Sequence, residues 1–136
     1  MESEQNQRTR SPIVLIIDDN QEIRNVIAWS LHHRGFQPVE AANGLEALRW
    51  MEDAASKQRY PSVILLDLAM PGIDGYSFLD WMQSTWGNRS PTPAIIVMTA
   101  GQLDTTSPPL SPLVNQIIAK PFHLHDLEDV IRTWCA

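Results

Sequence analysis

The strongest guide to the fold of this chain is residues 62–72, SVILLDLAMPG, where an apolar run leads directly into a carboxylate. Four apolar residues precede Asp67, and Met-Pro-Gly then interrupts the pattern. A short apolar run closed by turn residues predicts a strand buried on both faces of a parallel sheet. Asp67 should therefore lie at the carboxyl end of that strand, where open α/β sheets place their ligands. Considered alone, Asp67 could simply begin a turn.

Four further segments have the pattern of strands, and helical patterns separate them. Apolar runs at 13–17 and 94–98 predict buried strands, whereas the runs at 36–41 and 115–119 are weaker. Apolar residues at helical spacing occur in four places: from Ile23 to Arg34, after Asn43-Gly44, between Pro71 and Gly87, and from Leu124 onward. Alternating strands and helices predict a parallel sheet with helices on both faces and right-handed crossovers.

Composition limits the classes of function. The formal net charge of −6 argues against direct binding of nucleic acid, which requires clustered Lys and Arg. No apolar run approaches the roughly 18 residues of a membrane span, so we predict no membrane insertion. Cys135 is alone and supports neither a disulfide framework nor a cysteine metal site. We expect a cytoplasmic protein with a disordered tail at 1–12 and one domain at 13–136.

The carboxyl ends of parallel strands share one edge of a sheet, and that edge collects polar side chains. The predicted strands end at Asp18 and Asp19, at Asp67, at Thr99 and at Lys120. Carboxylates about 4 Å apart repel each other by on the order of 4 kcal/mol per pair at an effective dielectric near 20. A cation is therefore expected there, and Mg²⁺ best matches oxygen ligands that act together with a phosphate.

Asp67 is the predicted nucleophile of this site, because carboxylates can accept phosphoryl groups as acyl phosphates. Mg²⁺ would contact one phosphoryl oxygen, the Lys120 ammonium a second, and the Thr99 hydroxyl with a backbone N–H the third. Simpler interpretations exist for Thr99 as an ordinary strand residue and for Lys120 as a solvated side chain.

Asp18 or Asp19 has a simpler interpretation too, as the cap of the next helix in a pair with Glu22. If this edge had no function, all of these simpler interpretations would have to be true at the same edge of the sheet. We therefore favour a functional site.

Four motifs carry a resemblance to a known family: IIDDN, ILLDLAMPGIDG, VMTAG and IAKPF. In their order and spacing the chain resembles a response-regulator receiver domain, the CheY-like family of two-component signalling, from about Ile13 to Trp134. The resemblance implies an α/β, flavodoxin-like, doubly wound sheet of five parallel strands in the order 2-1-3-4-5.

The resemblance also implies roles for the residues at the predicted edge. Asp67 would accept a phosphoryl group from a sensor histidine kinase or a histidine phosphotransfer protein, and Thr99 and Lys120 would contact it. The implied Mg²⁺ ligands are all oxygen donors: Asp19, Asp67, the backbone carbonyl of Ala69 and, through water, Asp18. The Lys120–Pro121 peptide is expected to be cis.

Two features depart from the family pattern. The position three residues before the lysine is usually an aromatic residue that turns inward on activation, but here it is Ile117. The segment of the fourth helix contains Pro108, Pro109 and Pro112, and proline inside a helix costs about 3 kcal/mol. We predict an atypical or shortened fourth helix across 105–114, and a rebuilt output face beside an intact phosphoryl site.

The leading functional prediction is a signalling switch rather than an enzyme, with phosphotransfer limited to its own Asp67 and autodephosphorylation. Phosphorylation would change a surface that an unknown downstream protein recognises. The chain would act either as a stand-alone receiver or as part of a larger regulator. The alternative is a degenerate receiver that acts as an interaction module without phosphorylation. A phosphatase of the aspartyl type would need a second carboxylate two residues on, where the chain has Ala69.

Tryptophan positions suggest where a partner binds. Helical spacing places Trp134 on the apolar stripe of its helix, whereas Trp29 and Trp50 lie off theirs. Exposed tryptophan is enriched in interface hot spots. Trp29, on the helix that follows the acidic pair, is therefore a predicted docking residue for the phosphodonor, unless a neighbouring loop covers it.

Overall fold

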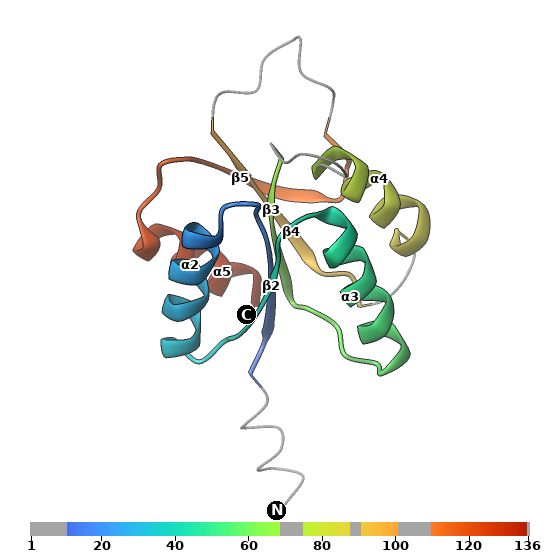
Figure 1. Cartoon of the computed structure of the whole chain (residues 1–136), viewed down its shortest axis with the longest axis horizontal. Coiled ribbons are helices and arrows are strands. Elements are labelled where there is room, and N and C mark those ends of the chain that lie inside the picture. Colours follow the sequence, from blue (N-terminus) through green and yellow to red (C-terminus); the bar gives the residue numbers. More distant parts are fainter. Residues whose placement is uncertain (1–10, 69–74, 88–90, 101–109, 136) are drawn as a thin grey trace, which may run out of the picture.

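The computed structural model describes residues 11–68, 75–87, 91–100 and 110–135 and has a parallel sheet between two layers of helices (Figure 1). Along the chain the elements are β1 (Ile13–Ile17), α2 (Gln21–His33), β2 (Gln37–Ala41), α3 (Gly44–Ser56), β3 (Val63–Asp67), α4 (Gly75–Trp86), β4 (Ala94–Thr99), β5 (Val114–Ala119) and α5 (Leu124–Cys135). The predicted alternation of strands and helices is confirmed.

The sheet has five strands, and its order β2-β1-β3-β4-β5 confirms the prediction. All four strand pairs are parallel. The register aligns the strand ends: Ile17 lies opposite Leu66, Asp67 opposite Met98, and Thr99 opposite Ala119. Residues that follow these positions therefore emerge together at one edge.

The core consists of two apolar layers, one on each face of the sheet. Helices α2 and α5 cover one face, and α3 and α4 cover the other (Figure 1). Ile27, Leu31 and Ile131 are buried in the first layer, whereas Phe78 and Trp86 are buried in the second. Each such side chain contributes about 1.5–3 kcal/mol on burial, so packing on both faces fixes the sheet.

Strand position explains why some sequence signals were stronger than others. All five residues of β1 and of β3 are buried, as expected for central strands. The strands β2 and β5 form the two edges, and β5 alternates between half-buried and exposed residues. Their mixed composition follows from that exposure. The last strand begins at Val114, one residue before the predicted start.

The segment between β4 and β5 is only partly described. Pro108 and Pro109 lie outside the described residues, so the prediction of an atypical fourth helix is tested only at its end. Residues 110–113 contain no helix, and Leu110 and Leu113 pack against the core layer below α3 and α4. Residues 1–10 of the predicted tail also lie outside the described part. The backbone carbonyl of Pro12 accepts a hydrogen bond from Gln37 N at 2.9 Å.

The tryptophans follow the helical-wheel prediction only in part. Trp29 is 64% exposed, as predicted. Trp50 is half-buried and packs against the core layer of α3 and α4, so its predicted exposure was wrong. Trp134 is 37% exposed rather than in the core, because its Nε1 donates to Gln116 Oε1 on the edge strand, at 2.9 Å. Among the described residues, no helix is long and apolar enough to cross a bilayer.

Candidate functional site

Three carboxylates meet at the carboxyl edge of the sheet. Asp18 follows β1 and Asp67 ends β3, and the pairing of these neighbouring strands brings them together. Asp18, Asp19 and Asp67 each place one carboxylate oxygen within 4.8 Å of the others. Asp18 and Asp67 are buried, whereas Asp19 is exposed to solvent. The predicted cluster of carboxylates is therefore present, with one open side.

Lys120 joins this cluster from the side of the edge strand β5. It follows β5, and its backbone N–H donates to the carbonyl of Thr99 at 2.7 Å. The peptide bond between Lys120 and Pro121 is cis, as expected from the sequence. Its Nζ lies 2.8 Å from Oδ2 of Asp18 and 3.5 Å from Oδ2 of Asp67. The ammonium thus lies between the two buried carboxylates.

The surroundings of Lys120 keep its side chain charged. Burial lowers the pKa of the ammonium, but the hydrogen bond that it donates to Asp18 and the charges of Asp18 and Asp67 outweigh this effect and raise the pKa above its ordinary value. Lys120 is therefore a fixed cation at neutral pH, able to stabilise negative charge that develops next to Asp67.

Asp18 is held on several sides, and capping of the next helix is not its role. Its Oδ1 accepts a hydrogen bond from Asn20 N at 2.9 Å, and its own N–H donates to the carbonyl of Ala41 at 3.2 Å. The N-cap of α2 is Asn20, whose Oδ1 accepts from Ile23 N at 3.1 Å. The simpler interpretation, in which Asp18 or Asp19 caps the helix, was therefore wrong, because Asn20 already supplies the capping oxygen.

The start of α4 lies close to the end of β3. A Cβ added to Gly75, the first residue of α4, would lie 2.7 Å from the carbonyl oxygen of Asp67 and 2.7 Å from Cα of Leu68. Both contacts involve backbone atoms, so any side chain at this position would push α4 away from the strand end. Glycine at position 75 therefore helps to fix the backbone that carries Asp67.

The remaining predicted site residues are Thr99 and Ala69. Thr99 is half-buried at the end of β4, and its pairing with Ala119 places it at the same edge as Lys120. The register sets it one residue beyond Met98, which lies opposite Asp67. Ala69, whose carbonyl was predicted to bind Mg²⁺, lies outside the described residues.

The donor set suits a hard divalent cation. Among the described residues the candidate ligands are carboxylate oxygens, and Mg²⁺ prefers oxygen ligands while keeping several waters. The exposed side of Asp19 leaves room for those waters and for a phosphate. Two buried carboxylates with one lysine between them leave an excess of negative charge that such a cation would offset.

An apolar groove lies beside the carboxylates, and sequence reasoning missed part of it. It runs between α2 and the loop after β5, and its apolar lining includes Ile23, Val26, Pro121, Phe122 and Leu124. Lys120 lines it too, so the groove reaches the site itself. The pattern of the sequence identified the α2 residues but gave Phe122 no role. Arg24, which donates to the carbonyl of Asp18, was also missed.

Comparisons with known proteins agree with one another on the family. A family model described as response regulator receiver domain matches residues 14–132. Sporulation initiation phosphotransferase F of Bacillus subtilis (strain 168) is 36% identical over 124 residues, which cover 89% of this chain and 91% of that protein. The probable transcriptional regulator ycf27 of Pyropia yezoensis is 29% identical over 120 residues. The match covers 88% of this chain but only 46% of that protein.

Solved structures give the same result for the fold. The crystal structure of a CheY-like response regulator receiver domain protein from Methanospirillum hungatei JF-1 has a TM-score of 0.74 at 25% identity. The match covers 93% of this chain and 95% of that one.

Proposed function

This chain belongs to the response regulator receiver family, and we propose that it is a switch that accepts a phosphoryl group on Asp67. The observation that carries the proposal is the position of the Asp67 carboxylate, which is buried beside Asp18, near Asp19, with Lys120 Nζ 3.5 Å from its Oδ2. The name of the related phosphotransferase F supports phosphoryl transfer as the chemistry.

In the proposed reaction an oxygen of Asp67 attacks the phosphorus of a phosphohistidine on a histidine kinase or phosphotransfer protein. A new O–P bond forms, the N–P bond breaks, and its electron pair returns to the imidazole of the donor. Lys120 turns from Asp18 to a phosphoryl oxygen, and the Thr99 hydroxyl donates to another. Preorganised charges of this kind act mainly by stabilising the charge of the transferring group.

Asp19, Asp67 and the carbonyl of Ala69 would hold Mg²⁺ directly, and Asp18 would hold it through water. When bound, Mg²⁺ supplies positive charge for the phosphoryl oxygens. The supporting observation is the set of three carboxylates within 4.8 Å, one of which is exposed. The protein releases no product in this scheme, because the phosphoryl group stays on its own side chain until hydrolysis.

The apolar groove is the proposed docking surface for the donor. Val26 and Trp29 are exposed on α2, one turn apart, and Val26 lines the groove. The Trp29 indole lies 4.2 Å from the ring of His33, whose Nδ1 donates to the carbonyl of Trp29 at 2.8 Å. An aromatic side chain held in this way loses little conformational freedom on binding.

The degenerate receiver is the competing proposal, and one observation favours it. Ile117 replaces the usual aromatic residue and is 47% exposed on the edge strand. The complete set of site residues favours phosphorylation instead.

Labelling with radioactive acetyl phosphate tests the proposal. The wild-type protein should take up label in the presence of Mg²⁺ but not when EDTA is present during labelling, and Asp67→Asn should take up none. Asp80→Asn, which changes an exposed carboxylate on α4, is the matched control and should label normally. Unlabelled wild-type protein would support the degenerate receiver, and rapid release of free phosphate in many turnovers would indicate a phosphatase.

A further inference from the structure

A buried arginine lies behind the acidic pair and contacts its backbone. Arg24 is on the first turn of α2, and its side chain is 12% exposed. Its Nη1 donates to the backbone carbonyl of Asp18 at 2.6 Å, and its Nε lies 3.4 Å from Oε1 of Glu40 on β2. A largely buried guanidinium is costly unless it is well paired, and the Nε of Arg24 is buried without a hydrogen-bond partner among the described residues, so its presence beside this site calls for an explanation.

The contacts of Arg24 fix the direction of a peptide plane. The carbonyl of Asp18 and the N–H of Asp19 belong to one rigid peptide unit. The N–H of Asp18 is bound to the carbonyl of Ala41, and its two carboxylate oxygens accept from Asn20 N and from Lys120 Nζ. With Arg24 on the carbonyl, each of the four polar groups of Asp18 has a partner.

Asp19 depends on this arrangement more than Asp18 does. Its side chain is exposed, so the direction in which its Cα–Cβ bond leaves the chain is set by its backbone dihedral angles. Those angles start from the peptide plane that Arg24 holds. Glu40, which is on an edge strand, forms an ion pair with the guanidinium at 3.4 Å, although Nε makes no hydrogen bond to it.

We propose that Arg24 is a positioning residue for the metal ligands: it holds the Asp18–Asp19 peptide so that Asp19 points into the cation site, and Glu40 orients it. This inference rests on the proposed function, because it assumes that the carboxylates bind Mg²⁺. Residues that orient metal ligands typically change metal affinity by about 10–100-fold when mutated.

The direction in which Mg²⁺ affinity changes when Arg24 is replaced distinguishes a positioning role from a purely electrostatic one. Arg24 is a cation near a cation site, so its removal should tighten Mg²⁺ binding if charge alone mattered. The positioning role predicts the opposite. Calorimetric titration with Mg²⁺ alone should give Arg24→Met an affinity about tenfold below wild type. Arg24→Lys, which keeps one donor, and Glu40→Gln should lie between the two.

Arg34→Met is the matched control. Arg34 caps the other end of α2, about 15 Å along the helix, and pairs with Glu128 rather than with the site. Its replacement should leave Mg²⁺ affinity unchanged. If Arg24→Met does not fold, as judged by circular dichroism, Arg24→Lys and Glu40→Gln still provide the test.

Two contrary outcomes have different meanings. Wild-type protein that binds Mg²⁺, with Arg24 variants that bind equally or more tightly, overturns the positioning role alone. An equal loss of affinity in Arg34→Met also overturns it, because the effect would then be a general loss of α2 structure. Wild-type protein that binds no Mg²⁺ overturns the proposed function together with this inference.

Discussion

Lys120 both compensates the acidic cluster and competes with a cation for it. Its ammonium contacts Asp18 at 2.8 Å and Asp67 at 3.5 Å. Since these two carboxylates belong to the proposed Mg²⁺ site, an entering cation must share them with Lys120. The same charge is then available to the phosphoryl group. This residue should therefore affect metal binding and phosphoryl transfer in opposite directions.

Replacement of Lys120 with Met should tighten Mg²⁺ binding several-fold, because a competing positive charge is lost. The rate of labelling by acetyl phosphate should fall by about 100-fold, as for the loss of one charge-stabilising donor. Calorimetry and labelling at saturating Mg²⁺ measure the two effects separately. Lys57→Met, which breaks an exposed pair with Asp53, should change neither. Weaker Mg²⁺ binding in Lys120→Met would contradict this role.

Sequence reasoning found the residues of the site but not what holds them. Asp18, Asp67 and Lys120 were identified because each directly follows or ends an apolar run, and the structure brings their side chains together. The cap at Asn20 was missed because it was assigned to Asp18 or Asp19, although Asn before a helix is a capping signal. Arg24 was missed because its partner is a backbone carbonyl, which no residue pattern displays. Contacts of a side chain with a carbonyl become visible only once the loop has a fixed path.

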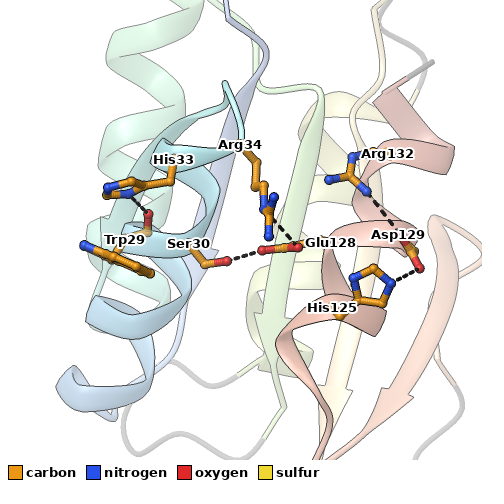
Figure 2. A network of polar contacts seen from close by, with 8 residues as sticks. All are labelled: Trp29, Ser30, His33, Arg34, His125, Glu128, Asp129 and Arg132. Atoms are coloured by element: carbon orange, nitrogen blue, oxygen red, sulfur yellow. Dashed lines mark hydrogen bonds and ion pairs between the residues drawn. The ribbon is translucent and has the colours of Figure 1, made fainter.

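At the level of elements, α2 and α5 are joined by a buried polar contact on one face of the sheet. Figure 2 shows Ser30 and Arg34 of the α2 region directed at Glu128 of α5. The hydroxyl of Ser30 donates to Glu128 Oε2, and Nε of Arg34 lies 3.3 Å from its Oε1. The proposed docking helix is thus coupled directly to the last helix.

This contact predicts a dependence of stability on pH. The hydrogen bond from Ser30 lowers the pKa of Glu128, burial opposes the shift, and the charge of Arg34 supports it; the net pKa lies below the ordinary value. Such a carboxylate stabilises the fold above its unfolded-state pKa of about 4.3. That stability is lost as the pH falls through the lower pKa of the folded state.

Glu128→Gln should therefore cost about 1–3 kcal/mol of unfolding free energy at pH 7. Its difference from wild type should shrink as the pH falls below about 4. Urea unfolding at a series of pH values measures this. Asp53→Asn, in an exposed pair on α3, should change the free energy by less than about 1 kcal/mol. A difference from wild type that stays constant down to pH 3 would show that Glu128 acts by packing alone.

Sequence patterns gave the central strands more accurately than the edges. The apolar runs of β1, β3 and β4 fall where predicted, because strands with two covered faces must be apolar. The start of β5 and the burial of Trp50 and Trp134 were not obtained. Both depend on which neighbours cover an edge of the sheet or the end of a helix, and helical spacing alone does not specify this.

At the level of the whole molecule, the fold brings the reactive edge and the apolar groove together. The groove between α2 and the loop after β5 reaches the site at Lys120, and Trp29 is exposed on α2 one turn beyond Val26, which lines the groove. A protein donor would therefore contact this surface while its phosphohistidine reaches Asp67. Acetyl phosphate is too small to use the surface, so in the proposed reaction it would need only the site itself: the carboxylates, Lys120, Thr99 and Mg²⁺.

Trp29→Ala should slow phosphotransfer from a cognate phosphorylated donor protein by at least about tenfold, the effect of a modest hot spot. Labelling by acetyl phosphate should not change. Single-turnover transfer measured with both donors gives the comparison. Trp134→Ala removes another partly exposed indole, on α5, and serves as the control. Equal slowing with both donors would count against docking by Trp29.

The identity of the phosphorylated side chain decides whether Asp67 is the phosphoacceptor. After labelling in Mg²⁺, reduction of the acyl phosphate with tritiated borohydride and peptide mapping by mass spectrometry identify the modified side chain. We predict that the tritium is found at Asp67 alone and is absent when EDTA is present during labelling. Modification of Asp18 or Asp19 instead, or labelling that does not require Mg²⁺, would contradict a cation site that leaves Asp67 as the phosphoacceptor.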